Sequence, residues 1–510
     1  MRRRTSAVAP LDRVPHPWAR SLRKRMGENT LILCAPLVLA LAACKPVGPN
    51  YSKPAYTAPE AYRETGATSV VAPENPTGGT WSAANPSDGM LRGKWWEIYN
   101  DPQLNTLEER IAASNQDLRH ASEVYLAARD QVAATRSGLF PAVSGSVGAS
   151  RNVISANRPA ASSTTHYNDY VLGAQASWEP DFWGRIRRSI ESSSTGAQAS
   201  AADLATLDLS LHAELAADYF QLRGLDSSSK LLAQTVTTLE NQLKLTEARL
   251  AGGVATEADV AQARTQLETV RAQQVEIGVA RTQLEHAIAT LTNQNAASFK
   301  LDASPLDLQL PRVPLGVPSQ LLERRPDVAA AERRAAQANA QIGIAKSAFY
   351  PNIPLTAAGG FESVNTGTWL TGPSALWSLG ASATELLFDA GQRRALTNAA
   401  RHNYEAQAAS YRSAVLAAFN SVEDQLAALR VLEQESAVEQ RAVASAQHSF
   451  DLSNQRYQGG VTSYLEVLTA ETALLNNQST AINLQTRQFV ASVALIRALG
   501  GSWDTTQLPR

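Results

Sequence analysis

The feature that most constrains this chain is a duplication of its body. Three separate motifs recur at one offset of 207 residues (379 − 172). They are Leu172-Gly173-Ala174 with Leu379-Gly380-Ala381, Gly184 with Gly391, and Arg249 to Val254 with Arg456 to Val461. A second match, Ser137 to Pro141 with Ser347 to Pro351, has an offset of 210 (347 − 137). Repeated motifs at a shared offset predict two structural repeats with the same internal order.

Each repeat contains a long stretch without proline, from Gly184 to Leu250 and from Gly391 to Tyr457. A helix of this length reaches roughly 100 Å at 1.5 Å per residue. A Gly-Gly turn ends each stretch, and apolar residues then recur at heptad spacing, which is typical of coiled-coil packing. These residues are Val260, Ala263, Leu267, Val270, Ile277, Leu284, Ile288 and Leu291, and then Leu468, Leu475, Ile482, Phe489 and Ile496. Each repeat is therefore expected to contain a long helical hairpin.

Two segments before each long helix alternate apolar and polar residues, which is typical of strands with two different faces. They lie around 143–150 and 170–179 in the first repeat, and around 353–361 and 377–384 in the second. A two-sided sheet in a soluble domain is the alternative for any one strand. Strands of about ten residues with one apolar face match transmembrane β-strands. Because lipid does not tolerate open sheet edges, four strands have to be completed by other copies of the chain.

The N-terminus has the features of a signal peptide. Arg20, Arg23, Lys24 and Arg25 precede an apolar run from Leu31 to Ala43, which is too short to span a bilayer. The run ends in Leu41-Ala42-Ala43-Cys44, which resembles the bacterial lipobox, so Cys44 is the predicted site of lipid attachment. In bacterial lipoproteins an Asp after the lipidated Cys favours inner-membrane retention. The residue here is Lys45, which fits sorting to the outer membrane. An ordinary signal peptide with an incidental cysteine is the alternative.

Composition and motifs give no support for an enzyme or a nucleic-acid-binding protein. The net charge is −1 and charged residues make up 18 % of the chain, so no basic surface is expected. The histidines lie in separate segments without metal-ligand spacing. No cofactor or metal is expected. Glu423 and Asp424 are expected on a solvated helix face, and Glu323 to Asp327 is interpreted as a helix start with Pro326 in its first turn.

Taken together, several segments resemble the TolC-like outer-membrane efflux proteins in their lipoprotein branch (OprM/NodT-type outer membrane factors). The resemblance runs from Cys44 to Trp503. Its carriers are Cys44 to Tyr51, Trp95-Trp96, Asp101-Pro102, Glu323 to Asp327, Phe349-Tyr350-Pro351, the two Gly-Gly turns and Ala498 to Trp503.

The resemblance implies a mixed α and β membrane protein in which three copies share a 12-stranded β-barrel continuous with a periplasmic α-helical tunnel. It implies a lipid-anchored location in the outer membrane, extending into the periplasm. The implied partners are two further copies of the chain, a periplasmic membrane-fusion adaptor and an inner-membrane efflux pump of the resistance-nodulation-division type.

These expectations divide the chain into six segments. They are a signal peptide (1–43), a lipid-anchored extended segment (44–92), a first efflux repeat (93–304), an inter-repeat linker (305–321), a second efflux repeat (322–503) and a C-terminal tail (504–510). Asp101 is expected to cap the first helix, with Pro102 at its first position.

The two hairpin tips are the predicted docking sites for the adaptor. A turn alone does not require an Arg before the glycines and a Val after them in both repeats. The candidate residues are Arg249, Leu250, Gly252, Gly253 and Val254, and then Arg456, Tyr457, Gly459, Gly460 and Val461. The alternative is that the glycines serve only to end a helix.

The resemblance also places a periplasmic gate just after the second tip, with Leu465, Thr469 and Thr472 as candidates. Two of these are neutral threonines where some relatives carry charges, so a gate held by packing and hydroxyl contacts is expected. The sequence thus predicts an exit duct of a tripartite efflux system. The alternatives are a duct for type I protein secretion and a structural periplasmic coiled-coil lipoprotein without a pore.

Overall fold

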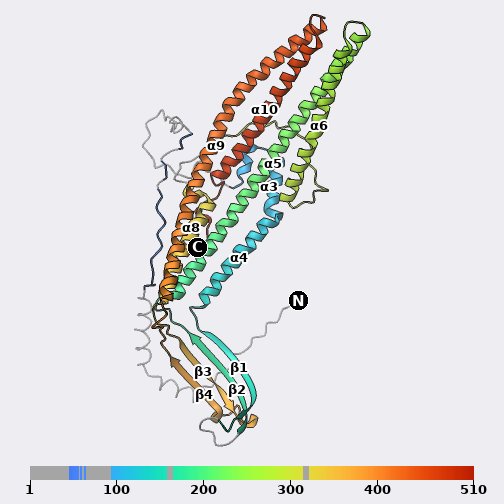
Figure 1. Ribbon diagram of the computed structural model, residues 1–510. Helices are drawn as coiled ribbons and strands as arrows, with labels where there is room; N and C mark the ends of the chain where they lie inside the picture. The colour runs from blue at the N-terminus through green and yellow to red at the C-terminus, as the bar shows by residue number, and fades with distance from the viewer. Residues whose placement is uncertain are drawn as a thin grey trace, which may run out of the picture. The chain divides into compact units, whose positions relative to one another are not determined.

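The structure is a computed structural model (Figure 1) that describes residues 45–56, 58–59, 62–64, 93–157, 165–313 and 321–509. The predicted signal peptide, Cys44, residues 65–92 and residues 314–320 lie outside these described residues. The chain forms two compact units. A sheet unit contains the described part of Met1–Pro49 with Arg136–Ser189 and Gln341–Thr397, and a helical unit contains the rest.

The sheet unit is built on four antiparallel strands in the order β1-β2-β3-β4. Their bounds are β1 (Ala142–Ile154), β2 (Thr165–Trp178), β3 (Leu355–Ser363) and β4 (Ala375–Ala381), with two short 3-10 helices, η3 (Thr366–Thr368) and η4 (Gly372–Ser374), between β3 and β4. The four predicted strands are confirmed, although β3 begins after Ile353 and β4 ends before Ala383. Among the described residues, the edge strands β1 and β4 each pair on one side only.

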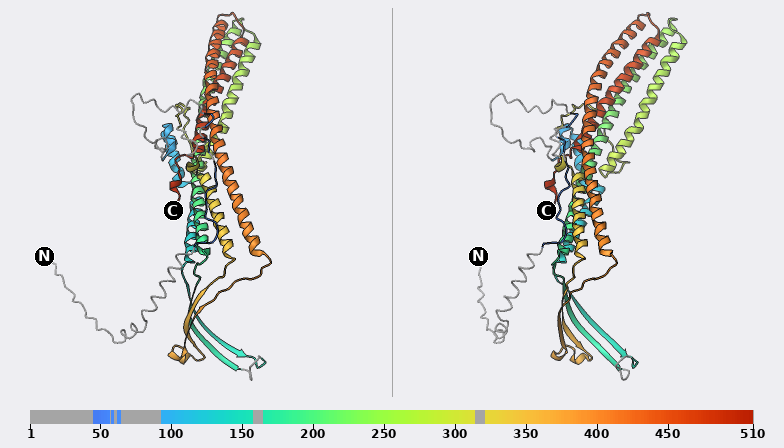
Figure 2. Two further views of the ribbon diagram at one scale, coloured as in Figure 1. Left: turned by 90° about the vertical axis from the view of Figure 1, so that its left-hand side faces the viewer. Right: turned by 60° about the vertical axis from the view of Figure 1, so that its left-hand side comes forward.

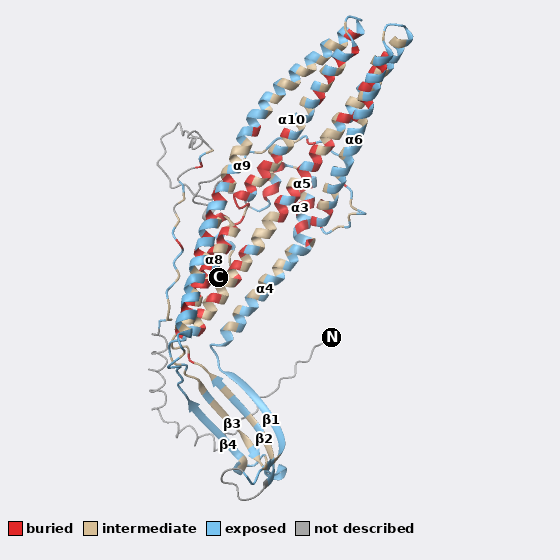
Figure 3. Cartoon of the chain, in the orientation of Figure 1, coloured by how far each residue is buried: buried red, intermediate tan, exposed pale blue. Residues whose placement is uncertain are grey.

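The strand register collects the predicted apolar positions on one face of the sheet. One cross-strand row is Val143, Ala176, Ala357 and Leu379, and another row on the same face contains Val147, Leu172 and Phe361. Ser144, Gln175 and Ser378 fall in a row on the other face. Val143, Val147, Trp377 and Leu379 are strongly exposed, and most of the sheet is accessible in Figure 3. The sheet of one chain therefore has an apolar face without a cover among the described residues.

The helical unit contains two long hairpins and several shorter helices. The helices are α3 (Pro102–Ser114), α4 (Gln116–Ser137), α5 (Arg185–Ala251), α6 (Glu257–Leu291), α7 (Leu321–Arg324), α8 (Pro326–Ser347), α9 (Gln392–Gln458) and α10 (Tyr464–Ala498), with 3-10 helices η1 (Trp95–Tyr99) and η5 (Thr505–Gln507). We call α5–α6 the first hairpin and α9–α10 the second. The two hairpins lie side by side in all views (Figures 1 and 2). No helix within the described ranges combines the length and the apolar character needed to cross a membrane.

The duplication holds at the level of whole helices. α5 and α9 each have 67 residues, and α6 and α10 each have 35 residues. Both pairs begin 207 positions apart (392 − 185 and 464 − 257). α4 and α8 each have 22 residues and begin 210 positions apart (326 − 116). The two repeats therefore share one backbone plan.

The helical unit packs around a core that joins the start of the first repeat to both hairpins. Asp101 caps α3 by accepting hydrogen bonds from the backbone of Gln103 and Leu104, with Pro102 at the first position as predicted. Tyr99 of η1 packs against Phe220 of α5 with ring centroids 4.8 Å apart. Phe220 packs against Phe489 of α10 at the same separation. Buried residues concentrate in the middle of this unit (Figure 3).

The described part of the N-terminal segment lies along the helices. Tyr51 donates a hydrogen bond of 2.6 Å to Glu332 on α8. Tyr56 stacks on Phe419 of α9 with ring centroids 5.7 Å apart. Glu423 accepts hydrogen bonds from the backbone amides that follow Tyr62. These contacts hold the described part of the segment along the helices, and we call it the N-terminal strap. Asp424 is exposed as expected, whereas Glu423 is half-buried and its carboxylate binds the strap.

Candidate functional site

Each hairpin turns at a tip with the same backbone geometry. Gly253 in the first tip and Gly460 in the second have φ angles of +74° and +77°, a region in which glycine carries no steric penalty. Val254 N–H donates to the Arg249 carbonyl at 2.9 Å, and Val461 N–H donates to the Arg456 carbonyl at 2.9 Å. The amide of Gly253 also donates to the Leu250 carbonyl, and that of Gly460 donates to the Tyr457 carbonyl. Together these bonds form a complete Schellman motif at both tips. The second glycine of each pair is therefore explained by helix termination.

The first glycine of each pair has no such backbone requirement. Gly252 has no positive φ angle. A Cβ added to Gly252 would approach other atoms only to 3.6 Å, and one added to Gly459 only to 3.4 Å. Both separations are ordinary van der Waals contacts. Helix termination thus leaves Gly252 and Gly459 without a structural reason to be glycine.

The two tips differ in the use of their arginines. Arg249 reaches across to the second tip, where its Nη1 donates to the Tyr457 carbonyl at 2.6 Å. Its guanidinium lies 4.6 Å from the centroid of the Tyr457 ring, within the range of a cation–π contact. Arg456 is exposed, and its side chain has no hydrogen-bond or ion-pair partner in the part of the chain that the structure describes. Arg249 therefore joins the two tips, and Arg456 remains available to a partner.

The exposed part of the tips is apolar and small. Val254 and Val461 expose 70 % and 71 % of their surface, and Leu250 is half-buried. Tyr457 is buried, and its hydroxyl lies 3.1 Å from the Thr246 hydroxyl of α5. Of the predicted docking residues, Tyr457 and Arg249 hold the tips together, whereas Val254, Val461 and Arg456 form the accessible surface.

The three predicted gate residues lie in the first turns of α10. Leu465 is 55 % exposed, Thr469 is exposed and Thr472 is half-buried. The Thr469 hydroxyl donates to the Leu465 carbonyl at 2.8 Å, and the Thr472 hydroxyl donates to the Leu468 carbonyl at 2.8 Å. Both threonine donors are used within their own helix. Leu465 is thus the predicted gate residue that offers free apolar surface.

A carboxyl group close to the gate candidates in sequence, Glu471, is buried. Glu471 is 4 % exposed on α10, and burial raises its pKa to about 7. Its neighbours on α5 and α10 are Gln242 and Tyr464, and the Tyr464 hydroxyl donates to Gln242 at 3.3 Å. The sequence contains a signal for this burial, because Glu471 lies three residues after Leu468 and four before Leu475 in the apolar stripe.

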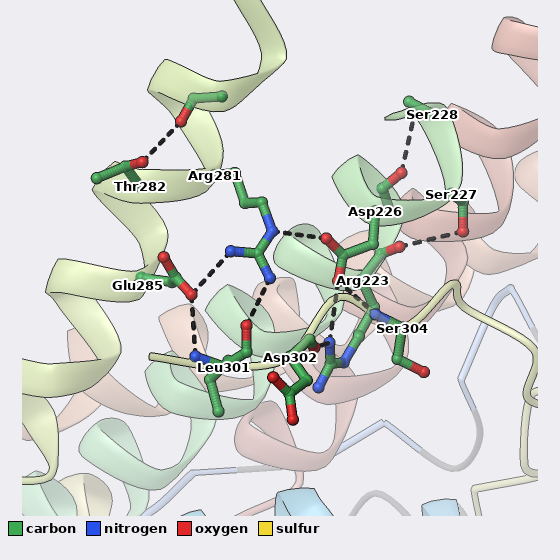
Figure 4. Close-up of polar contacts among 12 residues, drawn as sticks. Arg223, Asp226, Ser227, Ser228, Arg281, Thr282, Glu285, Leu301, Asp302 and Ser304 are labelled. Carbon is green, nitrogen blue, oxygen red and sulfur yellow. Dashed lines mark hydrogen bonds and ion pairs between the residues drawn. The ribbon is translucent and has the colours of Figure 1, made fainter. Parts of the chain in front are cut away.

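A buried ionic network holds the segment after α6 against the first hairpin (Figure 4). The two oxygens of Asp226 accept from Arg281 Nε at 2.7 Å and from Arg223 Nη1 at 2.9 Å. Arg281 also pairs with Glu285 at 2.8 Å. The Asp226 carboxylate accepts the Ser304 amide at 2.9 Å, and further bonds bind the backbone of residues 301–302. We call Arg223, Asp226, Arg281 and Glu285 the pin.

Sequence reasoning did not identify the pin. Its local signals are weak, since Arg223 and Asp226 are three residues apart and Arg281 and Glu285 are four apart, which is common on solvated helix faces. Only the packing of α6 on α5 brings the two pairs together.

His212 does not form part of a metal site. Its Nδ1 lies 2.6 Å from a carboxylate oxygen of buried Glu108, and its ring stacks on Trp96. Burial by itself would lower the pKa of His212, but hydrogen bonds to Asp208 and Glu108 outweigh it and raise the pKa to about 9. Across the described ranges, no group of three or more His, Cys, Asp or Glu side chains has an arrangement that could hold a metal ion. The pair fastens α3 to α5.

The chain is similar to known outer-membrane proteins in both sequence and structure. The model of the outer membrane efflux protein family matches residues 107–294 and 317–501. The pyoverdine export outer membrane protein OpmQ of Pseudomonas aeruginosa is 30 % identical over 83 % of this chain and 90 % of its own. The antibiotic efflux pump outer membrane protein ArpC of Pseudomonas putida is 32 % identical over 88 % and 92 %. The solved outer-membrane channel OprN has a TM-score of 0.81 at 30 % identity, covering 90 % of this chain and 99 % of its own.

Proposed function

The chain belongs to the outer membrane efflux protein family, and from this membership we propose that it is the exit duct of a tripartite efflux system that exports small toxic compounds or drugs. Relatives of the chain are named for pyoverdine export, antibiotic efflux and toluene efflux. The observation that carries the proposal is that the paired long hairpins occur in one chain with a sheet whose apolar face no other described residue covers. Neither feature alone calls for a duct.

The proposed assembly is a homotrimer with a 12-stranded barrel. Edge strands present unpaired backbone groups that lipid cannot satisfy, and β1 and β4 are such edges among the described residues. Three copies with four strands each would join β4 of one copy to β1 of the next. Light scattering of the protein in mild detergent is expected to give three chains per particle. A stable, monodisperse monomer would contradict the shared barrel.

The proposed anchor is a lipid on Cys44, which would fix the chain to the outer membrane. The described residues just after it support this position within the sheet unit. The Val47 amide donates to the Trp183 carbonyl at 3.0 Å, and Arg188 donates to the Val47 carbonyl at 3.2 Å. These contacts hold the chain where β2 leads into α5. A lipid here would lie near one end of the sheet.

The proposed partners at the tips are the helical hairpins of a periplasmic adaptor, which links the duct to an inner-membrane pump of the resistance-nodulation-division type. Support comes from the exposed Val254 and Val461 and from Arg456. Gly252 and Gly459 leave the backbone accessible beside them. Three copies would present six tips. Leu465, with Thr469 and Thr472 behind it, is the proposed gate at the periplasmic mouth.

The test of the proposed function is export by cells. Deletion of the gene is expected to increase the accumulation of a fluorescent efflux substrate, and the wild-type gene on a plasmid is expected to restore export. A matched chain with the signal peptide but without the second hairpin provides the negative control. Unchanged accumulation across a panel of dyes and antibiotics after deletion, in cells shown to express the protein, would contradict the proposal.

A further inference from the structure

A groove lies between the first hairpin and α10, wholly within the helical unit. It encloses a volume of about 930 Å³, at the upper end of the range for drug-sized ligands. Its walls come from α5, α6 and α10. At one end Gly224 permits close contact between α5 and α10, since a Cβ there would lie 2.9 Å from Thr486 Cγ2. At the other end buried leucines, among them Leu232 and Leu475, join the helices.

The lining of the groove has an apolar floor and no ionisable side chain. Leu225, Val270, Ile277 and Ile482 supply part of that floor. Arg271 of α6 follows the lining residue Val270 in sequence and is the arginine closest to the middle of that helix. It is already paired with Glu240 and Glu268 at 2.6 and 2.7 Å. A charged solute would lose its hydration here without gaining a counterion. The groove therefore favours uncharged molecules.

Free hydrogen-bonding capacity in the groove is concentrated in carboxamides. Hydroxyl groups of the lining threonines donate to carbonyls of their own helices, for example Thr269 to Thr265 and Thr486 to Ile482. By contrast, six lining amides make no side-chain hydrogen bond within the described residues. They are Gln221, Gln266, Gln273, Gln283, Asn476 and Asn483. Each carboxamide offers both donors and an acceptor, so the rim can match hydroxyl or amide groups of either polarity.

We propose that this groove is a binding site for uncharged amphipathic molecules of drug size. An aromatic or aliphatic body would lie on the apolar floor, and hydroxyl or amide groups would bind the carboxamides. The occupant would contact the first hairpin and α10 at once, so its affinity depends on the spacing of the two hairpins. A binding site in this groove goes beyond the proposed duct function. Its test does not depend on whether the protein conducts.

The test is protection of a thiol in the groove. The chain has two cysteines, both in the N-terminal segment, so Ser479→Cys adds a single thiol to the helical unit. Ser479 is exposed and lines the groove, whereas Thr480 is exposed and does not. Thr480→Cys is therefore the matched control, and the parent chain gives the background. The full chain is placed in lipid nanodiscs, so that no detergent competes, and maleimide labelling is followed with chloramphenicol as the probe.

Chloramphenicol is uncharged and carries an aromatic ring, hydroxyl groups and an amide. Its succinate ester keeps this scaffold and adds a carboxylate. At a concentration that fills nine-tenths of the sites, chloramphenicol is expected to slow labelling of the Ser479→Cys variant about ten-fold. It is expected to leave the Thr480→Cys variant unchanged, and the ester is expected to protect neither.

Three results would overturn the proposal. The first is no protection of the Ser479→Cys variant at the solubility limit of chloramphenicol. The second is equal protection at both positions, or equal protection by the ester. The third is a Ser479→Cys variant that does not react even without solute, because a neighbouring copy would then cover the groove. Each can occur while the protein still exports dyes, so failure here is distinguishable from failure of the proposed function.

Discussion

The first and second hairpins have helices of equal length but are held in different ways. Positions 207 residues after the pin hold Arg430, Glu433, Gln488 and Ser492. Arg430 pairs instead with Glu64 of the N-terminal strap at 2.7 Å, and both side chains are partly exposed. Gln488 and Ser492 bind Leu432 and Tyr99. Duplication has thus preserved the backbone, while the buried ionic network occurs in the first hairpin alone among the described residues.

The second helices of the two hairpins, α6 and α10, also begin in different ways. Thr256 and Asp259 form a complete capping box at the start of α6. At the equivalent start of α10, Ser463 makes no side-chain capping bond. α10 also buries Glu471, whereas the equivalent position in α6 is the exposed Arg264. We infer that the first hairpin is the fixed element and that the second, which carries the gate candidates, is held by contacts that cost less to break.

The largest expected effect comes from breaking the pin. Asp226→Asn removes the charge that pairs with buried Arg223 and with Arg281, so Arg223 loses its counterion and Arg281 keeps only Glu285. Loss of one partner in a buried pair lowers the free energy of unfolding by about 3–5 kcal/mol. Glu433→Gln, at the equivalent exposed position of the second hairpin, is expected to change it by less than about 0.5 kcal/mol. Thermal unfolding followed by circular dichroism measures both, and equal shifts would remove the contrast between the hairpins.

The next effect is the contribution of Glu471, in the second hairpin, to the pH dependence of stability. Burial raises the pKa of Glu471 to about 7 from its ordinary 4.5, so the folded state binds this proton more tightly than the unfolded state. Stability is therefore present below pH 4.5 and is lost as the pH rises through about 7. The loss amounts to at most about 3 kcal/mol. Glu471→Gln is expected to raise Tm at pH 8 and to flatten its fall between pH 5 and pH 8.

The control for Glu471 is Glu466→Gln, one turn and a half earlier on an exposed part of α10. This variant is expected to keep the wild-type pH profile of Tm. Burial also raises the pKa of Glu108 and Asp218, so part of the profile is expected to remain in the Glu471→Gln variant. A profile that flattens in the Glu466→Gln variant, or one that is identical to the wild type in the Glu471→Gln variant, would exclude Glu471 as a titrating group.

A smaller effect distinguishes the two glycines of the first tip. Gly253→Ala places a side chain at a φ angle of +74° and is expected to cost about 1–2 kcal/mol. Gly252→Ala meets no strained backbone and no contact closer than 3.6 Å, so its Tm is expected to equal that of the wild type. A Gly252→Ala variant that unfolds earlier than the Gly253→Ala variant would contradict the assignment of the Schellman motif.

The smallest effect on stability, with a large effect on export, is expected for Gly252→Asp and Gly459→Asp. Both positions are free of positive φ strain, so the trimer is expected to assemble normally. The new carboxylates would block a close approach of adaptor hairpins and reduce dye export to the level of the gene deletion. Ser410→Asp, on an exposed part of α9 away from the tips, is the control. Full export by both tip variants would show that the glycines do not contact the adaptor.

The long helices could be predicted because their determinants are local. Both proline-free stretches begin one residue before the observed helices. The heptad residues of α6 are buried or half-buried as their spacing indicates, with Val260, Leu267 and Val270 among the buried ones. The strand faces followed from alternation for the same reason.

The contacts between elements could not be predicted in this way. Asp226 meets Arg281 across 55 residues, and Arg249 meets Tyr457 across 208. Nothing in the local pattern of either arginine specifies its partner. The burial of Glu471 follows from its position in an apolar stripe, whereas its charge by itself argues for exposure.

The central claim is that the chain forms a duct whose closed end lies at the start of α10. The most direct measurement is single-channel conductance of the purified protein in planar lipid bilayers, with wild type and Leu465→Ala compared at the same voltage. Discrete conductance steps are expected for both proteins. The closed time is expected to be shorter in the variant, because Leu465 is the exposed apolar side chain proposed to fill the mouth of the duct. Absence of discrete steps from protein that is folded and inserted would contradict the duct, and identical gating of the two proteins would move the gate away from Leu465.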